Sequence, residues 1–184
     1  NYLTHEKFKL PQLDQHVDMS GGAVSIGRYF TEMLDPSMTW NDVAEMVRHW
    51  NGQFCLKGVM SVEDAKRAAE IGCTGIVLSN HGGRQLDGSR APFDQLAEVV
   101  DAVGDRLDVM MDGGVQLGTH VLKALALGAK AVGLGRFYLF PLAAAGRAGV
   151  ERALGLLRTE VERGMKLMGC KSISELSREQ LRFR

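Results

Sequence analysis

A histidine and an arginine lie three residues apart in a polar loop, and their side chains are well suited to acid–base chemistry on a small acid. Gly82 and Gly83 separate His81 from Arg84, and the loop directly follows the apolar run at residues 75–78. An imidazole can accept a proton near neutral pH, and a guanidinium can hold a carboxylate through two parallel hydrogen bonds. Because glycine lets a ligand approach the backbone closely, the loop predicts a site that binds an organic acid and removes a proton beside its carboxylate.

Polar residues follow three other short apolar segments in the same way. Lys57 follows the first segment, Asp112 ends the third and is followed by Gly113 and Gly114, and the fourth is followed by Gly135 and Arg136. Backbone N–H groups and a basic side chain at this last position would suit a phosphate. The segment Gly133-Leu134-Gly135-Arg136 is not a dinucleotide-binding fingerprint, because no third glycine follows at the required spacing.

Each of these positions also has a purely structural interpretation. Lys57 could be an exposed lysine at the end of a strand, and His81 could be a structural loop histidine. Asp112-Gly113-Gly114 and the segment with Gly135 and Arg136 could be tight turns between a strand and a helix. Convergence of all four positions on one rim is what favours a functional site.

Short strands alternating with amphipathic helices must position these residues. We predict strands at residues 53–58, 75–78, 109–112 and 131–134, and helices that begin near Thr39, Ser61, Pro92 and Thr119. Such alternation indicates parallel βα units, and the similarity of residues 69–79 to residues 125–135 favours a barrel over an open sheet. A complete (β/α)8 TIM barrel takes about 250 residues, so we expect an α/β fold that forms half of one.

The last part of the chain predicts a long amphipathic helix over residues 142–169. We expect one stripe of this helix to lie in the core, namely Val150, Leu154, Leu157, Val161, Met165 and Met168. The opposite face is expected to be solvated, namely Glu151, Arg152, Arg158, Glu160 and Glu162. Ser172 and Glu175 resemble a capping box that opens a final helix.

Composition narrows the partners and the compartment. The 22 basic residues balance 22 acidic ones, so we expect no nucleic-acid binding, and no apolar run is long enough to span a membrane, so membrane contact would be at most peripheral. The three cysteines form no CxxC pair, which favours reduced thiols and a cytoplasmic location. Any peripheral membrane contact would then be with the inner membrane. We expect Cys55 and Cys73 to be buried, and we predict no metal site. The remaining histidines are expected at the surface or in packing: His5, His16, His49 and His120.

Four motifs together resemble the FMN-dependent α-hydroxy acid dehydrogenases and oxidases, which include L-lactate dehydrogenases, glycolate oxidase, lactate oxidase and mandelate dehydrogenase. The motifs are Lys57-Gly58-Val59, the segment from Ser79 to Asp87, Asp112-Gly113-Gly114-Val115, and Gly135-Arg136. The resemblance runs from about Trp40 to the end of the chain. It implies that residues 39–184 are the C-terminal half of the family's barrel and that residues 1–38 are an irregular, loop-like segment.

The resemblance also implies a role for each site residue. His81 would be the catalytic base and Arg84 would hold the substrate carboxylate, while Lys57 would lie beside the flavin and stabilise the negative charge of reduced FMN. The other cofactor-binding positions would be Ser79, Asp112, Gly113, Gly114, Val115, Gln116, Gly135 and Arg136. Gln116 is a departure, because family members commonly carry an arginine there and glutamine brings no charge.

The expected function is FMN-dependent oxidation of a small L-2-hydroxy acid to the 2-oxo acid, with L-lactate as the first candidate. Two alternatives remain open: a non-redox TIM-barrel enzyme acting on a phosphorylated substrate, and an inactive half-barrel fragment. The family's first four βα units have no counterpart here, so we expect an N-terminal half-barrel or a homo-oligomer as partner. The sequence begins at Asn1 rather than methionine, which is compatible with a processed or truncated product.

Overall fold

The computed structural model describes residues 28–182 and divides the chain into two units, residues 1–43 and 44–184. In the first unit, residues 28–32 are helical, and helix α2 (Trp40–Trp50) begins before the boundary. The Asp42 carboxylate accepts hydrogen bonds from the backbone N–H and the hydroxyl of Thr39, at 2.6 and 2.7 Å, as expected at the start of a helix. The other residues of the predicted irregular segment, 1–27, lie outside the described residues, as do His5 and His16.

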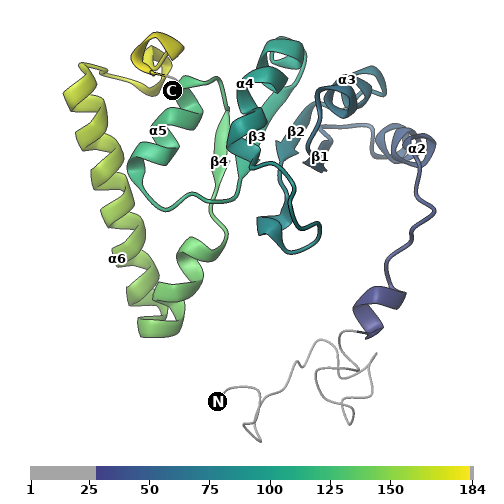
Figure 1. Ribbon diagram of the computed structural model, residues 1–184, viewed down its shortest axis with the longest axis horizontal. Helices are drawn as coiled ribbons and strands as arrows, with labels where there is room; N and C mark the ends of the chain where they lie inside the picture. The colour runs from purple at the N-terminus through teal and green to yellow at the C-terminus, as the bar shows by residue number, and fades with distance from the viewer. Residues whose placement is uncertain (1–27, 183–184) are drawn as a thin grey trace, which may run out of the picture. The chain divides into compact units, whose positions relative to one another are not determined.

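The second unit is built on a four-stranded parallel sheet (Figure 1). Its strands are β1 (Cys55–Val59), β2 (Gly75–Leu78), β3 (Asp108–Asp112) and β4 (Ala131–Gly133), and they lie side by side in chain order. All three neighbouring pairs are parallel, so the four carboxyl ends meet along one edge of the sheet. The four strands of the predicted βα units are therefore present, and they are parallel as predicted.

Each strand is followed by a helix, and local sequence signals set where these helices begin. The helices are α3 (Val62–Glu70), α4 (Pro92–Val103), α5 (Gly118–Ala126) and α6 (Arg136–Met168). The Ser61 hydroxyl accepts a hydrogen bond from the Asp64 N–H at 3.0 Å and so caps α3, and Pro92 occupies the first turn of α4. Helix α5 lies between β4 and α6 (Figure 1).

The two faces of the sheet differ sharply in burial. Ile76, Leu78, Val109 and Met111 are at most 2% exposed and form the face that the helices cover. On the other face the register aligns Lys57 with Val77 and Val77 with Met110, and these positions are half-buried or exposed. Parallel sheets are normally covered on both faces, whereas here, among residues 44–182, one sheet face has no covering layer.

The open face explains one incorrect prediction. Cys55 is exposed, although its position next to an apolar run predicted a buried thiol. It occupies the same face of β1 as Lys57, two residues away, and that face has no covering layer. Cys73 is buried as predicted, and all three cysteines are free thiols.

Helix α6 differs from its prediction in length and in exposure. It begins at Arg136, six residues earlier than predicted, and its backbone breaks at Ala145 and Gly146, which has a φ of +58°. Within the predicted core stripe only Leu157 is buried, while Leu154 is 43% exposed and Met168 is 36% exposed. The reason is that α6 packs mainly against α5, which covers only a narrow part of its surface.

Glu160 was expected on the solvated face of α6, and this prediction is wrong. Its carboxylate accepts a hydrogen bond at 2.7 Å from the backbone N–H of Gly118, the first residue of α5. A carboxylate at this end of a helix satisfies a free N–H group and complements the helix dipole. A Cβ atom on Gly118 would lie 2.5 Å from the Cβ atom of Glu160, so glycine is required for this close approach.

The predicted capping box at Ser172 and Glu175 is also wrong. The Ser172 side chain does not cap the short 3-10 helix Ile173–Glu175, and the Glu175 carboxylate instead accepts a hydrogen bond from the Lys171 N–H at 2.8 Å. A capping box does form one turn later, between Ser177 and Gln180. Across residues 28–182, no helix combines the length and the apolar character needed to cross a membrane.

Replacing Glu160 with alanine should destabilise the packing of α5 on α6. We expect Glu160→Ala to lower the free energy of unfolding by about 1 kcal/mol, the usual cost of losing a helix cap. Glu162→Ala is the matched control, because Glu162 is on the same helix and, among the described residues, pairs only with Arg158 four residues before it. Urea denaturation would measure both, and equal effects of the two variants would contradict the capping role.

Candidate active site

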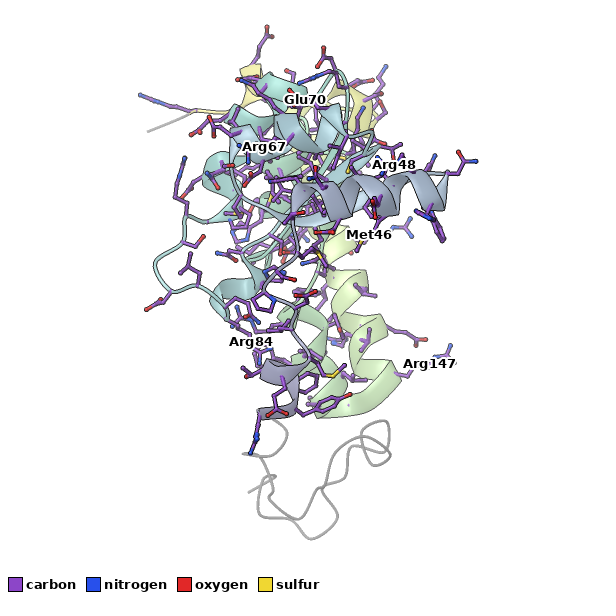
Figure 2. The ribbon with its side chains drawn as sticks, turned by 90° about the vertical axis from the view of Figure 1, so that its right-hand side faces the viewer. Met46, Arg48, Arg67, Glu70, Arg84 and Arg147 are labelled. Carbon is purple, nitrogen blue, oxygen red and sulfur yellow. The ribbon has the colours of Figure 1, made fainter. Side chains whose placement is uncertain are left out.

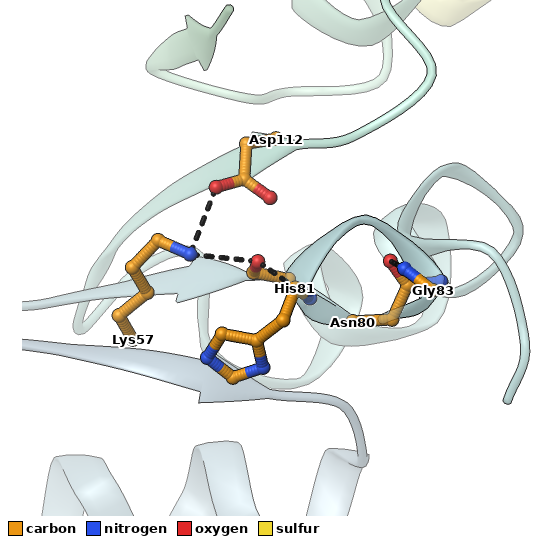
Figure 3. A network of polar contacts seen from close by, with 6 residues as sticks. Lys57, Asn80, His81, Gly83 and Asp112 are labelled. Carbon is orange, nitrogen blue, oxygen red and sulfur yellow. Dashed lines mark hydrogen bonds and ion pairs between the residues drawn. The ribbon is translucent and has the colours of Figure 1, made fainter. Parts of the chain in front are cut away.

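An ion pair joins the carboxyl ends of the strands on the open side of the sheet. The Lys57 ammonium lies 2.9 Å from the Asp112 carboxylate and donates a hydrogen bond to the Ser79 hydroxyl at 2.8 Å (Figure 3). Lys57 comes from β1 and Asp112 from β3, while Ser79 follows β2 and is only 1% exposed. Three separate strands are thus tied together by polar contacts at one point.

The loop after β2 holds the predicted base in an unusual backbone conformation. His81, Gly82 and Gly83 have φ values of +55°, +70° and +72°, and this left-handed region is unfavourable for a residue with a side chain. The Ser79 hydroxyl accepts a hydrogen bond from the His81 N–H at 3.2 Å, and the Asn80 side-chain oxygen accepts one from the Gly83 N–H at 3.2 Å. These two side chains hold the turn from inside the loop.

The His81 ring lies directly over β1 (Figure 3). A Cβ atom on Gly58 would be 3.0 Å from the ring carbon Cε1 of His81, and Gly58 itself has a φ of +96°. Only glycine meets both conditions at this position without strain. Gly58 therefore allows the His81 imidazole to lie close against β1, the strand that carries Lys57.

Arg136, at the start of α6, reaches back to the same loop. Its Nη2 atom donates a hydrogen bond at 2.8 Å to the carbonyl oxygen of Gly82, 54 residues away in the sequence. This contact places the basic side chain after β4 beside the histidine loop after β2.

Almost all of the predicted site residues line one cavity of about 730 Å³. The predicted residues on its wall are Lys57, His81, Arg84, Asp112, Gly113, Gly114, Val115, Gln116, Gly135 and Arg136. Ser79 is the one exception, because it is buried behind Lys57. The structure therefore brings together, in a single cavity, residues from all four strand ends.

Comparison with known proteins identifies the family. The sequence matches the FMN-dependent dehydrogenase family over residues 2–183. The chain belongs to this family. The L-lactate dehydrogenase (cytochrome) of Saccharomyces cerevisiae is 48% identical over 171 residues, which cover 90% of this chain and 28% of that protein.

Two solved structures agree with this assignment. The recombinant flavin-binding domain of baker's yeast flavocytochrome b2 has a TM-score of 0.77 and 51% identity, over 80% of this chain and 39% of that chain. A mandelate oxidase with benzoyl-formic acid has a TM-score of 0.73 and 48% identity, over 77% of this chain and 42% of that chain. The predicted fold class, half of a TIM barrel, and the predicted family and cofactor, FMN, are confirmed. The chain spans less than half the length of these relatives.

The residues at this cavity fit a flavin mononucleotide. Gly114 and Gly135 have no heavy atom within 4 Å of the position that a Cβ would occupy, so a ligand can approach the backbone there. Arg136 follows Gly135 at the N-terminus of α6, where free N–H groups and a guanidinium favour a phosphate. Lys57 supplies a further cation on the cavity wall, near His81 (Figure 3).

Sequence reasoning missed three residues that shape this site. Gly58 lies under the His81 ring, and Asn80 braces the loop through Gly83 and through a 3.4 Å hydrogen bond to the Arg90 carbonyl oxygen. Gly58 and Asn80 both fall inside the motifs that resemble the family, so the sequence did carry a signal for them. His120 was expected at the surface or in packing. It is partly exposed, accepts a hydrogen bond from the Gln116 N–H at 3.2 Å and lines a neighbouring cavity of about 490 Å³, which its local sequence does not indicate.

Removing the Ser79 hydroxyl should weaken the loop that carries His81. We expect Ser79→Ala to lower the free energy of unfolding by about 1 kcal/mol, because one oxygen accepts hydrogen bonds from two donors. Ser89→Ala is the control, since the described structure shows no hydrogen bond of the Ser89 side chain. If urea denaturation gave the same midpoint for both variants, the bracing role of Ser79 would be wrong.

Proposed function

We propose that this chain supplies the cofactor- and substrate-binding rim of an FMN-dependent enzyme that oxidises a small L-2-hydroxy acid to the 2-oxo acid. The observation that carries the proposal is the single cavity in which His81, Arg84, Lys57 and Arg136 face the same space. Membership of the FMN-dependent dehydrogenase family supports it independently.

The residues divide the work according to their chemistry. The Arg84 guanidinium holds the substrate carboxylate, and the His81 imidazole accepts one proton from the substrate. Bound FMN supplies an acceptor for two electrons. The residues fit two orders of events: deprotonation of the hydroxyl together with hydride transfer, or removal of the α-proton first. In both, the His81 ring must lie close to the substrate whose carboxylate Arg84 holds.

The remaining rim residues hold the cofactor in this proposal. Lys57 stabilises negative charge on the reduced flavin, while Ser79 and Asp112 fix the position of the lysine through the contacts of 2.8 and 2.9 Å. The backbone at Gly113, Gly114 and Gly135, with Arg136, holds the phosphate end. Val115 and Gln116 complete the wall between these two ends.

L-lactate is the first substrate candidate, because a relative with 48% identity is an L-lactate dehydrogenase (cytochrome). A mandelate oxidase is also 48% identical, so the side chain of the acid is a matter for measurement. Phe137, Tyr138 and Phe140 line the cavity and offer aromatic surface to that side chain. We keep a cytoplasmic location as a prediction.

We further propose that four more βα units complete the barrel, from an N-terminal half-barrel or from a second copy of the chain. The open face of the sheet supports this, as do the two outer strands β1 and β4, each of which pairs on one side only among the described residues. Exposed ladders of this kind readily pair with another strand.

The proposal is tested by the absorption spectrum and by substrate mixing. The protein that carries this chain should purify with a flavin spectrum, or acquire one when FMN is added, and anaerobic L-lactate should bleach the flavin band. The same measurement with mandelate and with glycolate would show which side chain of the acid the cavity accepts. Absence of any flavin binding would contradict the proposal and favour a phosphorylated, non-redox substrate.

His81→Gln should abolish turnover while FMN stays bound. Glutamine cannot accept the proton, and general base catalysis contributes at least about 100-fold to the rate. Stopped-flow measurement of flavin reduction checks this directly. Near-normal reduction in the variant would show that another group is the base.

Arg84→Lys should raise the KM for the acid by about 10-fold or more, because a hydrogen bond to a charged group contributes about 1.5–3 kcal/mol and lysine cannot form the paired contact. Arg106→Lys is the matched control. Arg106 lies just before β3, at the opposite end of the strands from the cavity, and its only described side-chain contact is with the Ala102 carbonyl oxygen at 3.5 Å. An unchanged KM in Arg84→Lys would place the carboxylate elsewhere.

A further inference from the structure

We infer that Arg136 is a positioning residue that couples occupation of the phosphate end of the cavity to the placement of His81. The hydrogen bond from Arg136 to the Gly82 carbonyl oxygen is the physical link. The inference rests on the proposed function, because it takes the group held near Gly135 to be the phosphate of the cofactor.

The loop needs such a link, because its conformation is intrinsically unfavourable. His81 has a φ of +55°, which costs energy for any residue with a Cβ atom, so the turn persists only while its surroundings hold it. Ser79 and Asn80 hold the N–H groups of His81 and Gly83 from within the loop. Arg136 ties the same turn to the strand end after β4.

The guanidinium can serve two partners at the same time. Arginine has five N–H donors in a rigid fork, and the contact with Gly82 uses Nη2. In the described part of the chain no carboxylate pairs with Arg136, so its charge is available to an anion. A lysine at this position would carry its donors on a single nitrogen at the end of a flexible stem, so it lacks the rigid fork that holds a carbonyl oxygen and an anion in two fixed directions.

The structure also shows why the partner of Arg136 is a glycine. A Cβ atom on Gly82 would lie 3.2 Å from Nη2 of Arg136, closer than such contacts comfortably allow. Gly83 has almost the same φ, +72° against +70°, but a Cβ atom there would meet nothing within 4 Å. Of the two adjacent glycines, only Gly82 is therefore closely approached by the arginine.

Hydrogen–deuterium exchange of the peptide that contains residues 79–86 tests the coupling without relying on activity. In Arg136→Lys this peptide should exchange about 3-fold to 10-fold faster than in the wild type, as expected for loss of one hydrogen bond. Arg147→Lys is the control, because Arg147 lies on the same helix, projects outward from it (Figure 2) and pairs with Glu151 alone within residues 28–182. Equal exchange in the two variants would overturn the inference.

Adding ligand separates this inference from the proposed function. With FMN or inorganic phosphate, the loop of the wild type should exchange no faster than without it, whereas the loop of Arg136→Lys should exchange faster still. If FMN fails to bind the wild-type protein, the proposed function fails, and the ligand-free comparison still decides whether Arg136 holds the loop. If FMN binds and the loop of Arg136→Lys is unchanged with and without it, only the coupling is wrong.

A pair of alanine variants provides a second test. Gly82 and Gly83 have nearly the same positive φ, so an alanine at either carries a similar backbone cost, but only Gly82→Ala places a Cβ against the guanidinium. We expect Gly82→Ala to weaken FMN binding at least about 3-fold more than Gly83→Ala, measured by quenching of flavin fluorescence. A weaker or equal effect of Gly82→Ala would contradict the link between the two sites.

Discussion

The parallel orientation of the four strands is the constraint on which the site depends. Parallel pairing places every carboxyl end at one edge, so residues 57, 79, 112 and 135 meet although the chain between the first and the last is long. The ion pair between Lys57 and Asp112 then fixes the first and third strand ends across β2, with Ser79 between them. No single loop could assemble these groups by itself.

Backbone freedom is the second requirement, and the structure uses it where ligands or rings must come close. Gly58 admits the His81 ring, Gly82 admits the Arg136 guanidinium, and Gly114 leaves open space. All three have positive φ values, which other residues adopt only at a cost. The site therefore depends as much on the absence of side chains at these positions as on the charged groups around them.

Local signals made most elements predictable, and distant contacts account for what could not be predicted. Ser61 caps α3 and Pro92 opens α4 as their positions indicate, because these effects need only neighbouring residues. Glu160 caps a helix that begins 42 residues earlier, and no local pattern reveals a partner so far away. Cys55 is exposed because one sheet face has no covering layer among the described residues, and the residues next to Cys55 do not encode whether such a layer is present.

The electrostatics of the cavity explain why so much of the chemistry lies in this half of the barrel. The chain is neutral overall, yet the cavity wall carries Lys57, Arg84 and Arg136 against a single carboxylate, Asp112. That carboxylate is already paired with Lys57, so the wall presents an excess of positive charge to a ligand. A carboxylate substrate, a phosphate and a reduced flavin are all anionic, and one cationic rim can attract each of them. This rim lies on the open side of the sheet, where a completing half-barrel would exclude water and so strengthen those attractions.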